Sequence, residues 1–515
     1  MSRGNGPENS TPDHPLIGVF RFLLVSLNID AILEESTIYR RRERLSRMAN
    51  GLGLGGAYGA TIERIKAQGG DKSRLGMEAL MWISHAERPL KVNELCHALA
   101  VELGSKVFNN GNVPSISTLV SCCQGLVTVD KEASTVRLVH YTLQEYLFAH
   151  PDSFSTPHSS IAEICMTYLK SEQVTTISAD HYPDLTDTPF LEYCAFYWGV
   201  HAKRQLSDRA KSLALELLQG RDAHISTQLL LRQVEGLRLE DSGTNFQFSA
   251  LHHASFLGIS EVVATLIEMK CCDANRGDFG GRSPLSWAAR NGHEEVVEIL
   301  LGQEAVNPNK PDSDGQTPLS YAAQMGHEGV VKILLEQEEV NRNKPDNSGQ
   351  TPLSHAAQIG REGVVKILLG QEEVNPNEPD NNDQTPLSHA AQMRHEGVVK
   401  ILLGREEVNP NKPNINGRTP LSYAAQYGHE GVVKILLERE EVNPDKPDSW
   451  GQTPLSFAAE NGHDEVVKIL LGREEVNPNK PDTWDITPLI YATRSGYKRV
   501  IELLKPHEVV TPRVT

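Results

Sequence analysis

Apolar residues recur through the second half of the chain in a block that repeats every 34 residues. Each block opens with Thr-Pro-Leu-Ser or a near copy, passes through paired alanines and a Gly-His step, and closes with Val-Val-Lys-Ile-Leu-Leu or a variant. The blocks begin at Ser283, Thr317, Thr351, Thr385, Thr419, Thr453 and Thr487, after a degenerate one at Ser249. So regular a period predicts a solenoid of eight repeats.

The unit that begins at Thr317 predicts two antiparallel helices. The Thr317 hydroxyl suits the cap of the first helix, and Pro318 suits its first position, where no backbone donor is needed. Gly326 supplies the left-handed residue that commonly ends a helix. Residues 330–335 provide the apolar face of a second helix. Both helices are shorter than the roughly 12 to 15 residues that an isolated helix needs in water, so we expect only stacked repeats to be stable.

These features resemble the ankyrin repeat, whose consensus carries T-P-L-H, paired alanines, a Gly-His turn and V-V-x-x-L-L. The resemblance covers about half of the chain. It implies a mainly α solenoid of stacked helix pairs, with β-hairpin loops projecting from one edge. It also implies protein partners, bound along the hairpin tips and the inner helix face.

The chain departs from that consensus in three ways. The unit is one residue longer than the usual 33. Arg394 stands where the other units have glycine, and a left-handed backbone there costs roughly 1 to 2 kcal/mol. Serine replaces the consensus histidine, which only His252 retains, and this puts the hydrogen bonds of that histidine between repeats in doubt. The serines are Ser286, Ser320, Ser354, Ser388, Ser422 and Ser456.

Two columns of positions vary among these similar units, so packing alone does not fix them. One lies on the inner helix, and the other lies at the hairpin tips, where Ile415, Trp450 and Trp484 are large and apolar. Binding hot spots favour large aromatic side chains, so both columns are candidate protein-binding residues. The alternatives are packing between repeats for the inner column and ordinary turn residues for the tips. The inner column comprises His253, Trp287, Tyr321, His355, His389, Tyr423, Phe457 and Tyr491.

A third column contains turn histidines, a residue type that also ligates metals. Packed helices lie about 8 to 10 Å apart, whereas two nitrogens on one zinc, each about 2.0 to 2.1 Å from it, lie far closer together. The ankyrin resemblance implies a structural role for these histidines, so we expect no metal. The column comprises His293, His327, His395, His429 and His463.

The first 240 residues follow a different pattern, with helical periodicity and no repeat. Apolar residues at helical spacing predict helices over residues 74–84, 92–101 and 115–123. Two alternating runs, 126–129 and 136–139, predict a two-stranded ribbon. Three helices and a ribbon indicate a winged helix. The expected recognition helix contains no Lys or Arg, so DNA binding remains a low-weight alternative.

The segment from His140 to Leu147 resembles the H-x-S-F-x-E-Y-L signature that closes the winged helix of NACHT-type signalling ATPases, especially fungal NLR-like proteins with ankyrin arrays. Residues 191–199 are similar to the helical stretch that follows it. The resemblance implies that His140 faces a nucleotide on an upstream ATPase module. No G-x-x-x-x-G-K-S/T loop occurs in the sequence, which favours the alternative of a hydrogen-bonded core histidine.

One glycine motif, Gly51, Gly53 and Gly56, matches G-x-G-x-x-G, but a charged helix rather than a strand precedes it. We therefore expect a loop between helices there and no nucleotide. The apolar run over residues 16–33 is interrupted by polar residues, which predicts a core helix rather than a membrane span.

The domain organisation follows from these patterns. We expect a disordered segment at 1–15, a helical remnant of a NACHT-associated region at 16–72 and a winged helix at 73–150. A helical linker at 151–246, ankyrin repeats at 247–506 and a tail at 507–515 complete the chain.

Composition and chemistry complete the prediction. The net charge of −17 argues against nucleic-acid and anionic-membrane partners, and seven cysteines without metal or disulfide spacing indicate reduced thiols. No nucleophile and base pair or paired carboxylates emerge. We predict a monomeric, cytoplasmic, non-enzymatic scaffold without cofactors, with the nucleus left open, that binds a protein partner. The alternative is a C-terminal part of, or docking partner for, a NACHT-type ATPase.

Overall fold

The computed structural model describes residues 36–43, 54–177, 186–219, 225–235, 248–270 and 272–507. The chain divides into two compact units, residues 1–244 and 245–515. The helix expected within residues 16–33, Gly51 and Gly53 lie outside the described residues. Gly56 lies within a helix, so the expected loop is wrong at that position. The run 54–67 is helical because it holds apolar residues at helical spacing and no proline.

The first unit contains the predicted winged helix. Val127 pairs with Leu138 in the antiparallel ribbon, one residue from the expected limits of each strand. The helices and the ribbon enclose a core that includes Trp82, Leu95 and Leu119, all fully buried. The elements are α3 (Leu54–Ala67), α4 (Gly70–His85), α5 (Val92–Ala100), η1 (Asn110–Asn112), α6 (Ile116–Cys122), β1 (Val127–Asp130), β2 (Thr135–Leu138) and α7 (Tyr141–Ala149).

Five further helices continue the first unit, with α8 and α10 packed against each other over much of their length. Aromatic rings pack these helices against the winged helix. The Trp82 ring meets Phe190 and Tyr193 edge-on, at centroid distances of 5.5 and 5.9 Å. The elements are η2 (Pro151–Ser153), α8 (Pro157–Leu169), α9 (Glu172–Thr175), α10 (Leu191–Arg204), α11 (Asp208–Leu218) and α12 (Ile225–Glu235).

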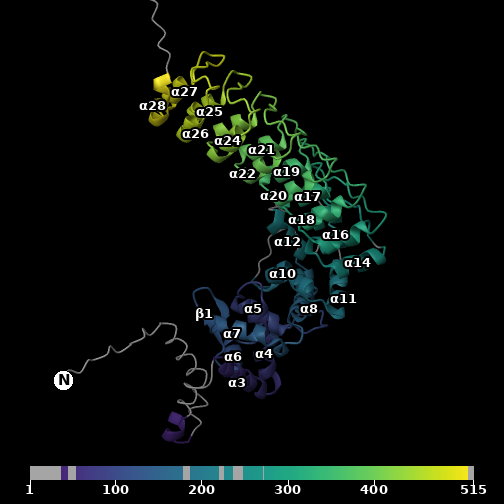
Figure 1. Cartoon of the computed structure of the whole chain (residues 1–515). Helices are drawn as coiled ribbons and strands as arrows, with labels where there is room; N and C mark the ends of the chain where they lie inside the picture. Colours follow the sequence, from purple (N-terminus) through teal and green to yellow (C-terminus); the bar gives the residue numbers. More distant parts are fainter. Residues whose placement is uncertain are drawn as a thin grey trace, which may run out of the picture. The chain divides into compact units, whose positions relative to one another are not determined.

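The second unit is the predicted stack of helix pairs, which Figure 1 shows following one another with their loops along one edge. The fold class is therefore confirmed. The helices are α13 (Ala250–Leu257), α14 (Ser260–Glu268), α15 (Pro284–Arg290), α16 (Glu294–Leu301), α17 (Pro318–Met325), α18 (Glu328–Leu335), α19 (Pro352–Ile359), α20 (Glu362–Leu369), α21 (Pro386–Gln392), α22 (Glu396–Leu403), α23 (Pro420–Gln426), α24 (Glu430–Leu437), α25 (Pro454–Asn461), α26 (Asp464–Leu471), α27 (Pro488–Ser495) and α28 (Lys498–Leu504), with η4 (Lys505–His507) last.

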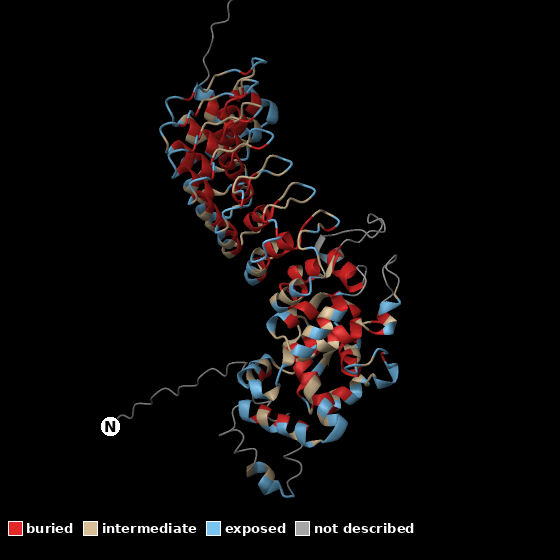
Figure 2. Cartoon of the chain, turned by 90° about the vertical axis from the view of Figure 1, so that its right-hand side faces the viewer, coloured by how far each residue is buried: buried red, intermediate tan, exposed pale blue. Residues whose placement is uncertain are grey.

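Local chemistry sets the helix limits as predicted. In the unit of α17, the Thr317 hydroxyl accepts a 3.2 Å hydrogen bond from the Ser320 N–H, Pro318 is the first helical residue, and Gly326 has φ 86°. Arg394 also adopts the left-handed backbone, with φ 64°, as expected from its place in the repeat. Figure 2 shows the buried residues concentrated on the helices of the array and the exposed ones along its loops.

The loops differ from the β-hairpins that the resemblance implies, because no strand is assigned within the described residues of the array. Each loop instead carries a tight turn closed by few backbone hydrogen bonds, such as those from the Asp346 N–H to the Gln350 carbonyl at 3.0 Å and from the Gly349 N–H to the Asp346 carbonyl at 2.9 Å. We call each such turn, residues 346–350 and its equivalents, a finger. The fingers begin at Asp278, Asp312, Asp346, Asp380, Asn414, Asp448 and Asp482.

Candidate protein-binding surface

The first residue of each finger organises the turn through its side chain. Asp346 Oδ1 accepts hydrogen bonds from the backbone N–H groups of Ser348 at 2.8 Å and Gln350 at 2.9 Å. The same pair of bonds recurs at Asp380 and Asp482. A short polar side chain that bonds its own backbone in this way stabilises a turn locally, so the local sequence determines the shape of the finger.

The second carboxylate oxygen of the same residue bonds the inner column. Trp287 Nε1 donates to Asp278 Oδ2 at 2.9 Å, and His355 Nε2 lies 3.0 Å from Asp346 Oδ2. His389 and Asp380 repeat the contact at 3.1 Å. Tyr321 and Tyr491 donate from their hydroxyls to Asp312 and Asp482.

The inner column is consequently buried. Trp287 is 0% exposed, Phe457 is 1% exposed, and Tyr491, the most exposed of the seven candidates, reaches 9%. Burial favours the alternative of packing between repeats, with the ring fixing the finger above it. These seven side chains then affect the binding of a partner only through the fingers that they position. The structure brings them into one buried row: Trp287, Tyr321, His355, His389, Tyr423, Phe457 and Tyr491.

Two repeats depart from this pairing. Asn414 replaces the aspartate in one, and its amide donates to the Tyr423 hydroxyl at 2.8 Å. In the next, Phe457 has no polar atom to offer, and Asp448 Oδ2 has no hydrogen-bond partner. Arg418 lies above the Phe457 ring, 4.6 Å from its centroid, with Nε 3.6 Å from Asp448 Oδ2.

The tip candidates, unlike the inner column, are exposed. Ile415 is 57% exposed, Trp450 38% and Trp484 61%. Trp450 and Trp484 occupy equivalent positions of adjacent fingers, whereas Ile415 stands one position earlier in its own. Phe279, at the position of Ile415 in the first finger, is 40% exposed and is a further apolar tip residue that the predicted tip column does not include.

Adjacent fingers are joined by backbone hydrogen bonds. The Thr483 N–H donates to the Trp450 carbonyl at 2.9 Å, and the Ile415 N–H donates to the Asn382 carbonyl at 3.0 Å. The equivalent bond joins each of the other successive pairs from Gly280 onward. The tips thus form one row with a defined spacing, which reduces the entropy lost when a partner binds.

The turn histidines bond the backbone of the preceding repeat. His327 Nε2 lies 2.9 Å from the Arg290 carbonyl, and His429 Nε2 lies 2.9 Å from the Gln392 carbonyl. Their rings pack on the turn glycine, since a Cβ added at Gly292 would lie 2.6 Å from the His327 ring. These contacts give the column a structural role.

His252 makes hydrogen bonds to the next loop, at Arg276 and at the end of the finger, that the serines do not reproduce. Its Nε2 lies 2.9 Å from the Arg276 carbonyl and 3.1 Å from the Arg282 carbonyl. Ser320 instead bonds Thr317 within its own unit, at 3.0 Å between the two hydroxyls. The doubt about bonds between repeats at the serine positions was therefore justified.

His140 caps α7 in the first unit. Its Nδ1 accepts from the Thr142 N–H at 3.3 Å and lies 2.9 Å from the Thr142 hydroxyl. The Thr142 hydroxyl in turn lies 2.8 Å from that of Tyr58. His140 is therefore hydrogen-bonded through the ring nitrogen that points to the helix, as the alternative expects, but it is half-buried rather than a core residue.

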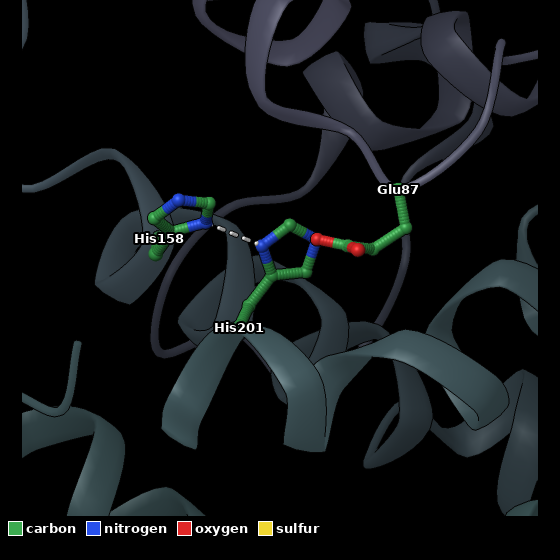
Figure 3. A group of neighbouring side chains, drawn as sticks. All are labelled: Glu87, His158 and His201. Carbon is green, nitrogen blue, oxygen red and sulfur yellow. Dashed lines mark hydrogen bonds between the residues drawn. The ribbon is translucent and has the colours of Figure 1, made fainter. Parts of the chain in front are cut away.

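One group of potential metal ligands was not foreseen, because its members come from distant segments. Ligand atoms of Glu87, His158 and His201 lie within 4.8 Å of one another (Figure 3). Tyr193 Oη accepts from the Glu87 N–H at 3.2 Å and lies 2.9 Å from His201 Nε2. His201 Nδ1 lies 2.8 Å from His158 Nδ1, and one of the two nitrogens donates to the other.

Other groups of the protein therefore supply hydrogen-bond partners to these three side chains. The Glu87 carboxylate is bound by the Arg204 guanidinium, which places a positive charge beside the histidines. Burial lowers the pKa of His201 to about 3, with smaller effects from the charges of His158, Arg204 and His85. These partners favour a structural hydrogen-bond network over a cation site.

Comparisons with known proteins agree with both halves of the structure. Residues 213–312, 304–380, 359–448 and 439–512 match the family model of ankyrin repeats in three copies. Residues 63–166 match the winged helix domain of GPI inositol-deacylase. No curated protein matches the chain. The crystal structure of the human ASB11 ankyrin repeat domain is similar, with 28% identity, a TM-score of 0.39, and coverage of 45% of this chain and 100% of that chain.

Proposed function

Because the chain belongs to the ankyrin repeat family, we propose that it is a protein-binding scaffold that holds its partner along the finger tips and the inner helix groove. The observation that carries the proposal is the exposure of Trp450 and Trp484 on fingers tied together by backbone hydrogen bonds. Exposed indoles on a rigid frame bury large apolar area at little entropic cost when a partner binds.

Polar side chains at the base of the fingers can supply polar contacts beside the tips. Gln384 Nε2 donates to Gln392 Oε1 at 3.2 Å, which joins finger and inner helix. Arg418 and Gln426 repeat this arrangement in the next repeat, at 3.3 Å. The buried inner column holds these residues in register through its bonds to the fingers. Apolar tips beside a polar groove have the composition of a non-obligate protein interface.

The first unit supports a regulatory attachment. We assign a NACHT-associated remnant to residues 16–72, a winged helix to 73–150 and a linker to 151–246, ahead of ankyrin repeats at 247–506. The match to the winged helix of GPI inositol-deacylase supports the middle assignment. Among the described residues no helix is long and apolar enough to cross a bilayer. We propose a cytoplasmic, monomeric and non-enzymatic protein.

Affinity capture with the full chain tests the scaffold. Wild-type protein is immobilised beside Trp450→Ala, Trp484→Ala and the double variant. Ile359→Ala is the matched control, because Ile359 is a large apolar residue, 41% exposed, on the same array away from the tips. We expect the double variant to lose the proteins that wild type and control both retain. Retention of the same proteins by wild type, by both single variants and by the double variant contradicts the role of the tips.

A second candidate is a regulatory part of a NACHT-type ATPase, either as a docking partner or as a portion of such a protein. The winged-helix match favours it. Calorimetric titration with ADP tests it, and binding that is lost in His140→Ala supports a nucleotide-facing winged helix. The DNA alternative predicts salt-sensitive duplex binding, which the absence of Lys and Arg from α6 disfavours.

A further inference from the structure

The repeats of the array share one stacking face. Each inner helix pair is covered on this face by the repeat that follows it. The serine after the Pro-Leu step is 0 or 1% exposed in six repeats, and the second alanine of each pair is 0% exposed. These small residues let the next helix pair approach closely.

The same face is open in the last described repeat, formed by α27 and α28. Ile490, at the serine position, is 38% exposed. Thr493, at the second alanine position, is exposed, and Leu489 and Ile501 are partly exposed. Their equivalents in the six preceding repeats are 0 or 1% exposed. We call Leu489, Ile490, Thr493 and Ile501 the end face.

Two substitutions on the end face, Ile490 and Ile501, run against those of a solvent-facing cap, whereas Thr493 in place of alanine does not. Terminal repeats of a solenoid normally carry a polar outer face. Here an exposed isoleucine, Ile490, replaces a serine that is buried elsewhere, and Ile501 replaces a buried valine. The end face therefore remains an apolar stacking surface, continuous with the interface that holds the repeats together.

Basic residues surround this apolar surface. Arg494 follows Ile490 by four residues, Lys498 precedes Ile501 by three, and Lys505 follows Ile501 by four. Residues at these spacings share one helix face. All three cations are exposed.

Two of these cations, Lys498 and Lys505, are specific to the last repeat, whereas Arg494 has an equivalent in Arg290. Lys498 replaces the Glu or Asp that opens the second helix in the six preceding repeats, and Lys505 replaces a leucine in all six. A cation at a helix N-terminus opposes the helix dipole, so Lys498 is not placed there for helix stability. Residues 482–507 hold four cations and three acidic residues, in a chain of net charge −17.

We propose that the end face docks an acidic amphipathic helix of a partner protein, with the apolar stripe of that helix on Ile490 and Ile501 and its carboxylates beside Arg494, Lys498 and Lys505. The proposal rests on the scaffold function and adds a second site with a stated partner chemistry. A second copy of this chain is disfavoured, because face-to-face docking would bring two basic rims together.

Three synthetic helical peptides test the proposal with the full chain. They share one leucine stripe and carry Glu, Lys or Gln on the polar face, and fluorescence polarisation reports their binding. We expect the Glu peptide to bind about tenfold more tightly than the Lys peptide. Ile490→Ser and Lys498→Glu install the residues of inner repeats, and each is expected to weaken the Glu peptide about tenfold. Lys434→Glu, the same charge change on an exposed lysine of α24, is the matched control.

Every other outcome overturns the proposal. These outcomes are no binding of the Glu peptide, equal binding of the Glu and Lys peptides, and indifference to Ile490→Ser. A dimer in solution that Ile490→Ser dissociates would show that a second copy is the occupant. Binding that appears only after removal of residues 508–515 would show that the tail occupies the end face. Trp450→Ala and Trp484→Ala leave the peptide affinity unchanged, so failure of the tip site is told apart from failure of this one.

Discussion

The indole nitrogen of Trp287 donates a 2.9 Å hydrogen bond to Asp278, which lies nine residues earlier at the start of the finger above it. The same link is made by Tyr321 and by His355 to the aspartates of their own fingers. Indole, phenol and imidazole differ in shape, but each carries a polar hydrogen far from the backbone. The variation along the inner column is therefore compatible with one conserved contact, from a ring donor to a finger carboxylate.

Phe457 breaks this rule, and restoring it should stabilise the array. In Phe457→Tyr the new hydroxyl reaches Asp448 Oδ2, which now has no hydrogen-bond partner. We expect the free energy of unfolding of the array to rise by about 0.5 to 1.5 kcal/mol, measured by urea denaturation. Tyr423→Phe, which removes the bond between Tyr423 and Asn414, should lower it by a similar amount. An unchanged or lower stability of Phe457→Tyr would show that the missing hydrogen bond to Asp448 Oδ2 does not destabilise the array.

Features set by neighbours in sequence were predictable. Thr317, Pro318 and Gly326 fix the helix limits because a cap, a proline and a left-handed glycine act within one turn of chain. The left-handed backbone of Arg394 followed from its place in the repeat. Exposure of the tips at Trp450 was also expected, because loops lie on the surface.

Contacts made through the fold were not predictable. The pairing of Trp287 with Asp278 requires the finger to fold back over the inner helix, which neither residue indicates alone. For this reason a column that varies could be interpreted as a binding surface although it is buried. The group of Glu87, His158 and His201 joins three separate segments, and no local spacing marks it.

Arg394→Gly should also stabilise the array. Arg394 has φ 64° where the glycine of the preceding repeat, Gly360, has φ 82°. A non-glycine residue in this conformation costs roughly 1 to 2 kcal/mol. We expect the free energy of unfolding to rise by about this amount, with a higher melting midpoint. Gly360→Ala, the matched control, should be destabilised, because its new Cβ would meet the His395 ring. A midpoint unchanged or lowered in Arg394→Gly contradicts the strain at this position.

The ion pair of Arg88 with Glu94 should matter more than ion pairs on the surface. Glu94 is 1% exposed, and Arg88 binds both of its carboxylate oxygens, at 2.7 and 2.8 Å. Arg88→Met leaves that charge buried without its cation, and we expect a loss of about 3 kcal/mol in the stability of the first unit. Arg74→Met, which breaks the exposed pairs of Arg74 on α4, should cost less than about 1 kcal/mol. Equal losses in the two variants would show that burial of Glu94 is not what makes the pair matter.

Acid should destabilise the first unit through His201. This side chain is 0% exposed, and burial first, then the charges of His158, Arg204 and His85, lower its pKa to about 3. The unfolded chain binds the proton near the ordinary pKa of about 6.5, so the folded state is favoured above that pH. The free energy of unfolding of the first unit then falls progressively as the pH is lowered from about 6.5 to about 3. The loss reaches about 2 kcal/mol at pH 5.

Hydrogen exchange of α10, followed by mass spectrometry between pH 7 and pH 5 after correction for the intrinsic pH dependence of exchange, measures this loss in the first unit alone. A proton added to His201 would place a charged ring with an N–H on both nitrogens in a fully buried site, so protection of α10 should fall as the pH is lowered. His201→Gln removes the titrating group, and we expect this variant to be less protected than wild type at pH 7 and to change less on acidification. An identical pH dependence in the two proteins would assign the acid sensitivity to other groups, of which His85 and His158, both with pKa values lowered chiefly by burial, are the nearest.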